Sequence, residues 1–317
     1  MAASPSMTNY PNGFAYGINI RGMPVNNAYS GRVWWLDSVT GADGNPGTHI
    51  RPFATLQRAI NQARANKGDI IMVRAGHAET ISTATALALA TAGVSIIGNG
   101  INGQRPTFTL DTATTATIGI QAANISFTNC LFVANFAAIA SLFTLTNAPG
   151  FTLLNCEFRD TTSVLNFVAI VTTDTTSNHA NDLAIQGCNF NGLGATANTT
   201  MISMLGTNAR VTVQGNYMSS AATTDGGAMI IATGKVVTGL QMTDNYYNLK
   251  GSASSTGGIL ITTDGSTNSG VLTRNNAQSL DATTPILVTA SSGFVFGLNY
   301  YTHTADKSGY LLPAADS

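Results

Sequence analysis

Carboxylate side chains are the residues of this sequence most able to do chemistry, and they are few. The chain of 317 residues contains 15 Asp and Glu residues. Their densest group comprises Glu157, Arg159 and Asp160, with Asp174 and Asp182 in the segment that follows. A glycoside hydrolase needs two carboxyl groups about 5–10 Å apart. A polysaccharide lyase needs clustered carboxylates that bind Ca²⁺ and a basic side chain beside them. Glu157 and Arg159 lie two positions apart on one predicted strand, so both side chains point outward. We therefore predict an exposed ion pair between them, with subunit contact or catalysis as the alternatives.

Two further groups of polar residues have the composition of a site. His77 and Glu79 lie two positions apart near a predicted helix start, which suits either a polar turn or an acid–base pair, and we predict the turn. Asp43, Gly44 and Asn45 resemble the start of a calcium-binding loop, but the remaining ligands and the closing glutamate are missing. We interpret this segment as a turn as well. The sequence therefore predicts no catalytic residue, no metal and no cofactor.

The adjacent residues Trp34 and Trp35 could form an aromatic platform for a sugar ring. In a strand, however, successive side chains point to opposite faces of the sheet. We therefore predict that one ring lies in the core and that the other packs under a helix or under an N-terminal arm.

A column of small and amide residues is the most regular polar feature of the chain. Its seven members are Cys130, Cys156, Cys188, Asn216, Asn245, Asn275 and Asn299. Apolar residues recur five and three positions before nearly every member, as Ile125 and Phe127 do before Cys130. A repeat with a fixed pattern and a variable spacing is typical of a solenoid, in which each repeat is one coil and the insertions are loops.

Each repeat has a second strand-like segment before the column. These segments are rich in Ile, Val, Leu and Thr and end at turn-forming residues: 117–123, 142–148, 169–175, 201–207, 229–235, 259–265 and 286–292. After Phe127 the alternation of inward and outward residues slips at Asn129, so that Cys130 also points inward. This slip predicts a tight bend between two strands of one coil.

We expect the column to point into the core, where coils stack about 4.8 Å apart. Stacked Asn amides can hydrogen-bond along such a column, and Cys fills the same position as a small, weakly polar residue. The alternatives for the cysteines are a disulfide between neighbouring coils or a metal site. Because their number is odd and no histidines cluster near them, we predict a packed column of reduced thiols.

The two ends of the chain are less regular. Residues 1–31 lack periodicity and predict an extended N-terminal arm, residues 32–301 predict the β-helix, and residues 302–317 form a tail. Within 53–65, Phe53, Leu56 and Ile60 share one face and predict an amphipathic helix that caps the open end of the core. The aromatic residues of the arm and the tail are candidate partner contacts: Tyr10, Phe14, Tyr16 and Tyr310.

The composition excludes several classes of function. Charged residues make up only 9% of the chain, against about 25% in an average soluble domain, and the net charge is −1. We therefore expect no nucleic-acid partner, and the absence of an 18-residue apolar run predicts no membrane span. The N-terminus lacks the basic and apolar regions of a signal peptide, which counts against an exported polysaccharide-degrading enzyme.

Several segments resemble right-handed parallel β-helix proteins of the pectate-lyase-like superfamily. They include Gly-Ala-Asp-Gly-Asn-Pro-Gly-Thr (41–48), Gly-Asp-Ile-Ile-Met-Val-Arg-Ala-Gly-His (68–77), Ile-Ser-Phe-Thr-Asn-Cys (125–130) and Leu-Gln-Met-Thr-Asp-Asn (240–245). The resemblance covers about residues 32–301 and implies an all-β solenoid with an inward Asn ladder. That fold hosts lyases, hydrolases, adhesins and viral structural proteins, so it implies no single function.

The whole chain resembles more narrowly the β-helix proteins of tailed-phage virions, through Tyr-Pro-Asn-Gly-Phe (10–14) and Gly-His-Ala-Glu-Thr-Ile (76–81). Members that cement or decorate capsids act as trimers. The resemblance implies a non-enzymatic bacteriophage protein, made in the host cytoplasm and placed on the capsid exterior. Its expected partners are the major capsid protein and two further copies of itself. The alternatives are a carbohydrate-active β-helix, such as a polysaccharide lyase, a hydrolase or a glycan-binding tailspike, and a surface adhesin.

Overall fold

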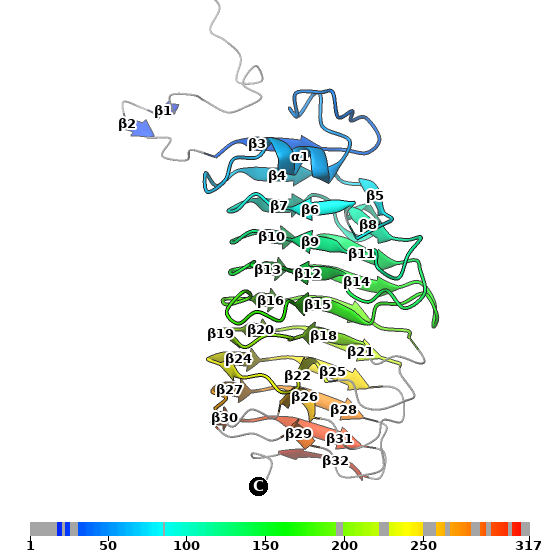
Figure 1. Cartoon of the computed structure of the whole chain (residues 1–317), viewed down its shortest axis with the longest axis vertical. Helices are drawn as coiled ribbons and strands as arrows, with labels where there is room; N and C mark the ends of the chain where they lie inside the picture. The colour runs from blue at the N-terminus through cyan, green and yellow to red at the C-terminus, as the bar shows by residue number, and fades with distance from the viewer. Residues whose placement is uncertain are drawn as a thin grey trace, which may run out of the picture.

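The chain is wound into a parallel β-helix, whose successive coils stack into three long sheets (Figure 1). The computed structural model describes residues 31–84, 86–194, 199–221, 228–249, 258–263, 267–279, 286–289, 293–303 and 306–311. It also describes a separate antiparallel pair, β1 (Ile18–Ile20) and β2 (Met23–Val25). The predicted fold class, an all-β parallel β-helix, is confirmed.

Three sheets run the length of the solenoid, and each receives one strand from nearly every coil. Sheet 1 comprises β3 (Val33–Leu36), β4 (Ile70–Val73), β7 (Ser95–Gly98), β10 (Ser126–Thr128), β13 (Thr152–Leu154), β16 (Ala184–Gln186), β20 (Thr212–Gln214), β24 (Leu240–Thr243), β27 (Gly270–Thr273) and β30 (Phe294–Phe296). Sheet 2 comprises β5 (Ala78–Ile81), β8 (Thr107–Leu110), β11 (Leu131–Ala134), β14 (Glu157–Asp160), β17 (Asn189–Asn191), β21 (Tyr217–Ser220), β25 (Tyr246–Leu249), β28 (Asn276–Ser279), β31 (Tyr300–His303) and the antiparallel β32 (Asp306–Leu311).

Sheet 3 comprises β6 (Leu87–Leu89), β9 (Ile118–Ile120), β12 (Phe143–Leu145), β15 (Ala169–Thr173), β18 (Thr200–Ser203), β22 (Ile230–Ala232), β26 (Gly258–Thr263) and β29 (Ile286–Thr289). A short two-stranded sheet, β19 (Asn208–Ala209) and β23 (Val237–Thr238), lies in the segment between sheets 3 and 1. A 3₁₀ turn, η2 (Asn102–Gln104), precedes β8.

The coils bend between sheets 1 and 2 through one residue in the left-handed conformation. These residues have φ between 51° and 63°: Asn129, Asn155, Gly187, Gly215, Asp244 and Arg274. One left-handed residue reverses the inward and outward alternation of the strand, which is the slip that the sequence shows at Asn129. Asn and Gly adopt this conformation at little cost, and they fill the first four of these positions.

The column that follows each bend points into the core, and its Asn side chains form a hydrogen-bonded ladder. Oδ1 of Asn245 accepts from the backbone N–H and from Nδ2 of Asn216, both at 3.0 Å. Nδ2 of Asn245 donates to Val213 O at 2.8 Å and to Asn275 Oδ1 at 2.9 Å. The same bonds join Asn275 to Asn299. Each buried amide is thus satisfied by the neighbouring coils, which avoids a penalty of about 1–3 kcal/mol for each unpaired group.

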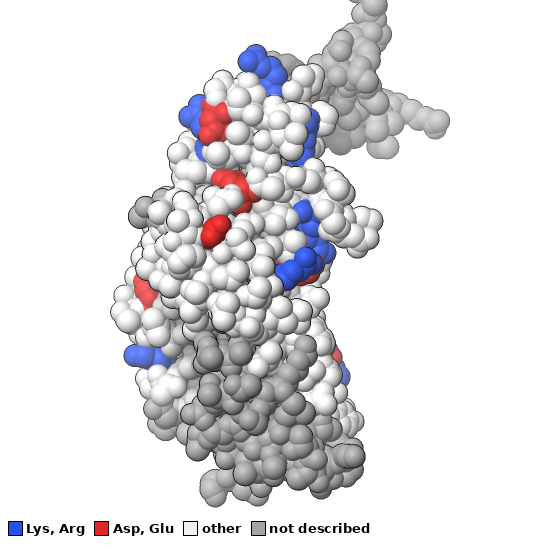
Figure 2. Space-filling model, turned by 90° about the vertical axis from the view of Figure 1, so that its right-hand side faces the viewer, with Lys and Arg blue, Asp and Glu red and all other residues white. Residues whose placement is uncertain are grey.

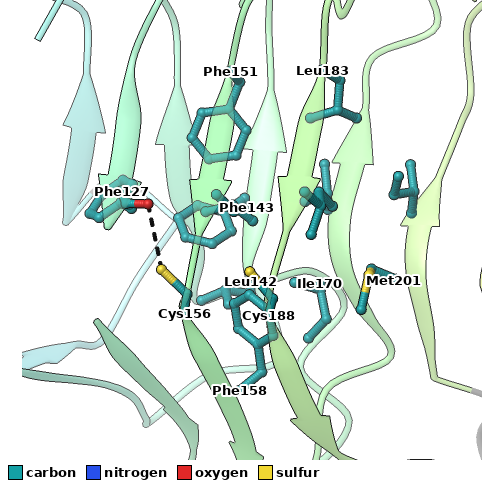
Figure 3. Close-up of a cluster of buried hydrophobic side chains, with 14 of the residues drawn as sticks. Phe127, Leu142, Phe143, Phe151, Cys156, Phe158, Ile170, Leu183, Cys188 and Met201 are labelled. Atoms are coloured by element: carbon teal, nitrogen blue, oxygen red, sulfur yellow. Dashed lines mark hydrogen bonds between the residues drawn. The ribbon is translucent and has the colours of Figure 1, made fainter. Parts of the chain in front are cut away.

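The cysteines continue this ladder with sulfur in place of the amide. The sulfurs of Cys156 and Cys188 accept from the backbone N–H groups of Cys130 and Cys156, respectively. The Cys156 thiol donates to Phe127 O at 3.6 Å, as Figure 3 shows. That carbonyl lies three residues before the column, which is where Asn Nδ2 donates in later coils. All three cysteines are buried and free, and burial raises the pKa of the Cys130 thiol well above its usual value.

Aromatic side chains fill the core beside the cysteines. Phe132 stacks on Phe108 and on Phe158 along sheet 2, with ring centroids 5.5 and 5.9 Å apart. Phe143 of sheet 3 meets Phe132 edge-on at 5.0 Å, and Phe127 of sheet 1 lies 5.4 Å from Phe143 (Figure 3). Rings from all three sheets therefore meet in one continuous core.

A helix closes the N-terminal end of this core, as expected, but it is shorter than the predicted range 53–65. Helix α1 (Leu56–Gln62) begins after Thr55, whose side chain accepts from Arg58 N as an N-cap. Phe53 instead forms an extended bridge with Leu36, and Ala63 is already extended. The apolar spacing that suggested a longer helix thus includes Phe53, which belongs to the first coil of the β-helix.

The ladder predicts a large effect for one internal substitution. Asn245→Ala removes the acceptor of two Asn216 donors, the side-chain donor to Val213 O, and one of the two donors to Asn275 Oδ1. We expect the free energy of unfolding in urea to fall by about 2–4 kcal/mol. Asn276→Ala, at an exposed position of the next coil, is the matched control and should change it by less than about 0.5 kcal/mol. Equal losses in the two variants would refute the structural role of the ladder.

Candidate functional site

The predicted ion pair between Glu157 and Arg159 is present, and it has a third member. The Glu157 carboxylate lies 2.5 Å from Nη2 of Arg159 and 3.1 Å from Nη1 of Arg105, on the outer face of sheet 2. The side chain of Arg159 is half exposed, so solvent screens this pair and it contributes about 0–1 kcal/mol. Arg105 escaped the sequence reasoning because it lies 52 residues before Glu157 and two coils away.

The remaining carboxylates of this group lie on other sides of the coil. Asp174 follows β15 of sheet 3, and its Oδ2 lies 2.7 Å from Nδ1 of His179. Asp182 lies in the turn before sheet 1 and accepts two bonds from Arg210, at 2.6 and 2.8 Å. These bonds, with the charge of Arg210, hold the pKa of Asp182 below its usual value. The structure therefore does not bring the acidic group together.

Asp160 turns inward at the end of β14 and is buried. Its Oδ1 accepts from Phe167 N at 2.9 Å, and its Oδ2 accepts from Leu193 N at 2.8 Å and from Gly194 N at 3.3 Å. Burial raises the pKa of Asp160 to about 6, although the three N–H donors favour the charged form. This carboxyl group ties together the loops of two successive coils and faces no open cleft.

The turn over residues 41–48 uses its acidic residue to fix the start of the helix. Oδ1 of Asp43 accepts from the backbone N–H groups of Ala54 and Thr55, both at 3.0 Å, and Oδ2 accepts from the Thr55 hydroxyl at 2.8 Å. The carboxylate is thus engaged with the protein itself, which is consistent with a turn rather than a calcium loop.

His77 and Glu79 serve the same end of the molecule. Nε2 of His77 lies 3.3 Å from Glu79 Oε2, and the Glu79 carboxylate accepts from Leu56 N at 3.0 Å in the first turn of α1. A carboxylate at a helix N-terminus is stabilised by the unpaired N–H groups there. The His77 ring is buried and packs 5.5 Å from Phe108. Glu79 lies in β5 rather than in the predicted turn, and its carboxylate binds the first turn of α1.

Trp34 and Trp35 point to opposite sides of β3 and form no common platform. Trp34 packs on Phe53 with ring centroids 5.8 Å apart, and its Nε1 donates to Asp69 at 3.3 Å. Trp35 meets His49 edge-on at 4.6 Å. Beside Trp34, a cavity of about 290 Å³ is lined by Arg32, Val33 and the turn 46–48.

Asp69 anchors this N-terminal end from within. Burial would raise its pKa, but the Arg64 guanidinium at 2.7 Å and the N–H groups of Arg32 and Arg64 hold the pKa of Asp69 below its usual value. Charged residues elsewhere stand mainly in such pairs, and the face in Figure 2 is largely uncharged where it is described.

The candidate partner contacts fall on residues whose side chains the structure does not describe. Tyr10, Phe14 and Tyr16 lie outside the described residues, and of Tyr310 only the backbone is described, in β32 opposite Tyr301. Within the described ranges no group of three His, Cys, Asp or Glu residues could hold a metal ion. No helix in the same ranges is long and apolar enough to cross a membrane.

The stacked parallel coils and the buried Asn ladder define this chain as a parallel β-helix protein. It belongs to the family described as "Protein of unknown function (DUF1565)", whose model matches residues 39–284. No curated protein matches the chain in sequence.

Solved structures are similar to this chain at low sequence identity. A rhamnogalacturonan lyase is 13% identical, with a TM-score of 0.54 over 85% of this chain and 73% of its own. The GH136 lacto-N-biosidase from Eubacterium ramulus is 10% identical, with a TM-score of 0.41 over 86% of this chain and 68% of its own. ORF18 of Geobacillus virus E2 is 10% identical, with a TM-score of 0.33 over 78% of this chain and 57% of its own. At such identities the likeness to the lyase shows the fold alone.

Burial of Asp160 predicts a pH dependence of stability with a defined sign. Its pKa is about 6 in the folded state against an ordinary 3.8, so its contribution is full below pH 3.8 and is lost as pH rises through 6. Between pH 7.5 and 4.5 we expect the wild type to gain about 2 kcal/mol relative to Asp160→Asn. Urea unfolding of both proteins at the two pH values measures the difference. A constant difference between them would contradict the raised pKa.

Proposed function

We propose that this chain is a non-enzymatic structural protein of a phage particle. In this proposal it binds the outside of the capsid lattice as a trimer, contacts the major capsid protein and stabilises the shell. It is made in the host cytoplasm and ends on the virion. The resemblance of the whole chain to β-helix proteins of tailed-phage virions supports this assignment.

One structural observation carries the proposal. Every carboxylate whose side chain is described accepts a hydrogen bond from another residue of the chain: Asp37, Asp43, Asp69, Glu79, Asp111, Glu157, Asp160, Asp174, Asp182 and Asp244. These acidic groups stabilise turns, helix caps and ion pairs, so each of them has a structural role in the fold. The surface that is available to other proteins consists of regular, nearly uncharged sheet faces, which suits contact with a protein lattice.

Binding to capsid shells tests this proposal directly. Purified protein should co-sediment with capsids that lack it and should raise the temperature at which those shells break. A chain without residues 1–30 should bind more weakly if the arm grips the shell. Glu157→Gln should bind as the wild type does, because it alters only an exposed ion pair. Failure of the full chain to co-sediment with the shells of its own phage would overturn the proposal.

A carbohydrate-active β-helix is the second candidate, and Glu157 is the observation that favours it. Its carboxylate is partly open to solvent on a sheet face and has two guanidinium groups within 3.1 Å. An acid beside a base is the minimum that a lyase or a hydrolase requires. Under our proposal neither the wild type nor Glu157→Gln cleaves polysaccharides, measured as new reducing ends or as unsaturated products. Cleavage that is lost in Glu157→Gln or Asp182→Asn would favour this second candidate instead.

A further inference from the structure

Exposed apolar residues gather on the last coils, on both sides of the bend that joins sheets 1 and 2. On sheet 1, Val271 of β27 and Val295 of β30 are neighbours in register and are 41% and 63% exposed. In the bend that follows β30, Leu298 is 55% exposed. These three side chains face solvent, two of them from strands that are otherwise ordinary β-helix strands.

The sheet 2 side of the same bend carries a column of tyrosines. Tyr217 of β21 stacks on Tyr246 of β25, with ring centroids 5.1 Å apart and planes at 4°. Continuing down the same register, Asn276 and then Tyr300 follow, and Tyr300 is 48% exposed. We call the set of six residues the corner patch: Val271, Val295, Leu298, Tyr217, Tyr246 and Tyr300.

In the two columns that contain Val295 and Tyr300, the large apolar residues that are exposed lie in the last coils and, at the opposite end of the solenoid, at Val33, which is 38% exposed. Between them, Ile70, Ala184 and Leu131 are partly buried. In the column of Val271 and Val295, earlier coils carry Thr152 and Thr212. In the column of Tyr300, earlier coils carry Glu157 and Asn189. Folding of the coil does not require large apolar residues at these positions, because both columns point outward. Clustered exposed apolar residues mark surfaces that bind other proteins, and Tyr is enriched at such interfaces.

We propose that the corner patch is the surface through which this chain associates with two further copies of itself around a three-fold axis parallel to the solenoid. The patch has two flanks on two different sheets, with a sharp bend between them. In a closed ring each subunit offers one surface to one neighbour and a different surface to the other. Sheet 1 and sheet 2 provide those two surfaces at the same height along the axis, so both flanks are covered at once.

Charge supports a second copy as the occupant. The corner patch is uncharged, and the charged residues in the bend beside it, Asp244 and Arg274, pair with each other at 2.6 and 2.7 Å. Two such corners meet without like charges facing each other. The described side chains of the corner patch offer no charge to a strongly acidic or basic partner. The inference rests on the trimer of the proposed function and adds the surface that builds it.

Mass measurement by light scattering during gel filtration tests the inference. The wild type should elute at about three times the chain mass of 32.8 kDa. Val295→Asp and Tyr300→Asp, each at micromolar concentration, should elute as monomers. Thr152→Asp and Asn189→Asp place the same charge on the same two columns in earlier coils and should remain trimeric. A monomeric or dimeric wild type overturns the inference, and so do trimeric Val295→Asp and Tyr300→Asp variants.

A pair of more conservative substitutions tests the corner patch with less risk of misfolding. Val271→Ser and Val295→Ser insert small polar residues of the kind that earlier coils carry in this column, and circular dichroism should match the wild type. We expect their combination to raise the dissociation constant of the trimer at least tenfold, and an unchanged constant overturns the inference. Capsid co-sedimentation separates the two proposals. A trimer that does not bind shells refutes the proposed function alone, and a monomer that binds shells refutes the corner patch alone.

Discussion

Stacking coils one strand spacing apart requires each buried polar group to find its partner in the coil above or below. The Asn residues of the column meet this requirement with amide donors and acceptors, and Cys156 meets it with a thiol that both donates and accepts. Because the ladder and the sheets obey the same spacing, bends, core aromatics and hydrogen bonds remain aligned over the whole stack. The regularity of the fold follows from this one condition.

The same condition divides the molecule into an inside and an outside with different tasks. Inside, polar residues such as Asn245 and Asp160 are hydrogen-bonded to backbone groups and, in the case of Asn245, to the amides of neighbouring coils. Outside, the coil leaves most positions free to vary, and the chain fills many of them with Thr, Ser, Asn and Gln. The large apolar residues that are exposed there, Tyr217 and Val295 among them, therefore carry more information about partners than the buried polar column does.

The sequence predicts the fold well because inward residues repeat. The slip at Asn129 and the recurrence of Cys130 through Asn299 are visible without coordinates, since each coil must satisfy the same geometry. Contacts between coils are harder to foresee. Arg105 reaches Glu157 across two coils. Asp160 points inward because it continues the alternation of β14, although its place in the sequence grouped it with the outward Glu157. The predicted helix was too long because Phe53 belongs to the first coil of the β-helix, although its position also matches helical spacing.

The single left-handed residue at each bend has a consequence for how such a molecule changes length. Each coil repeats the same bend, so after a whole coil is duplicated or deleted the flanking coils can pair with each other through the same geometry. Each such event moves the last coils by one strand spacing, about 4.8 Å, relative to the helix-capped end. The length of the solenoid therefore changes in fixed steps of one coil, and the number of coils sets the distance between its two ends.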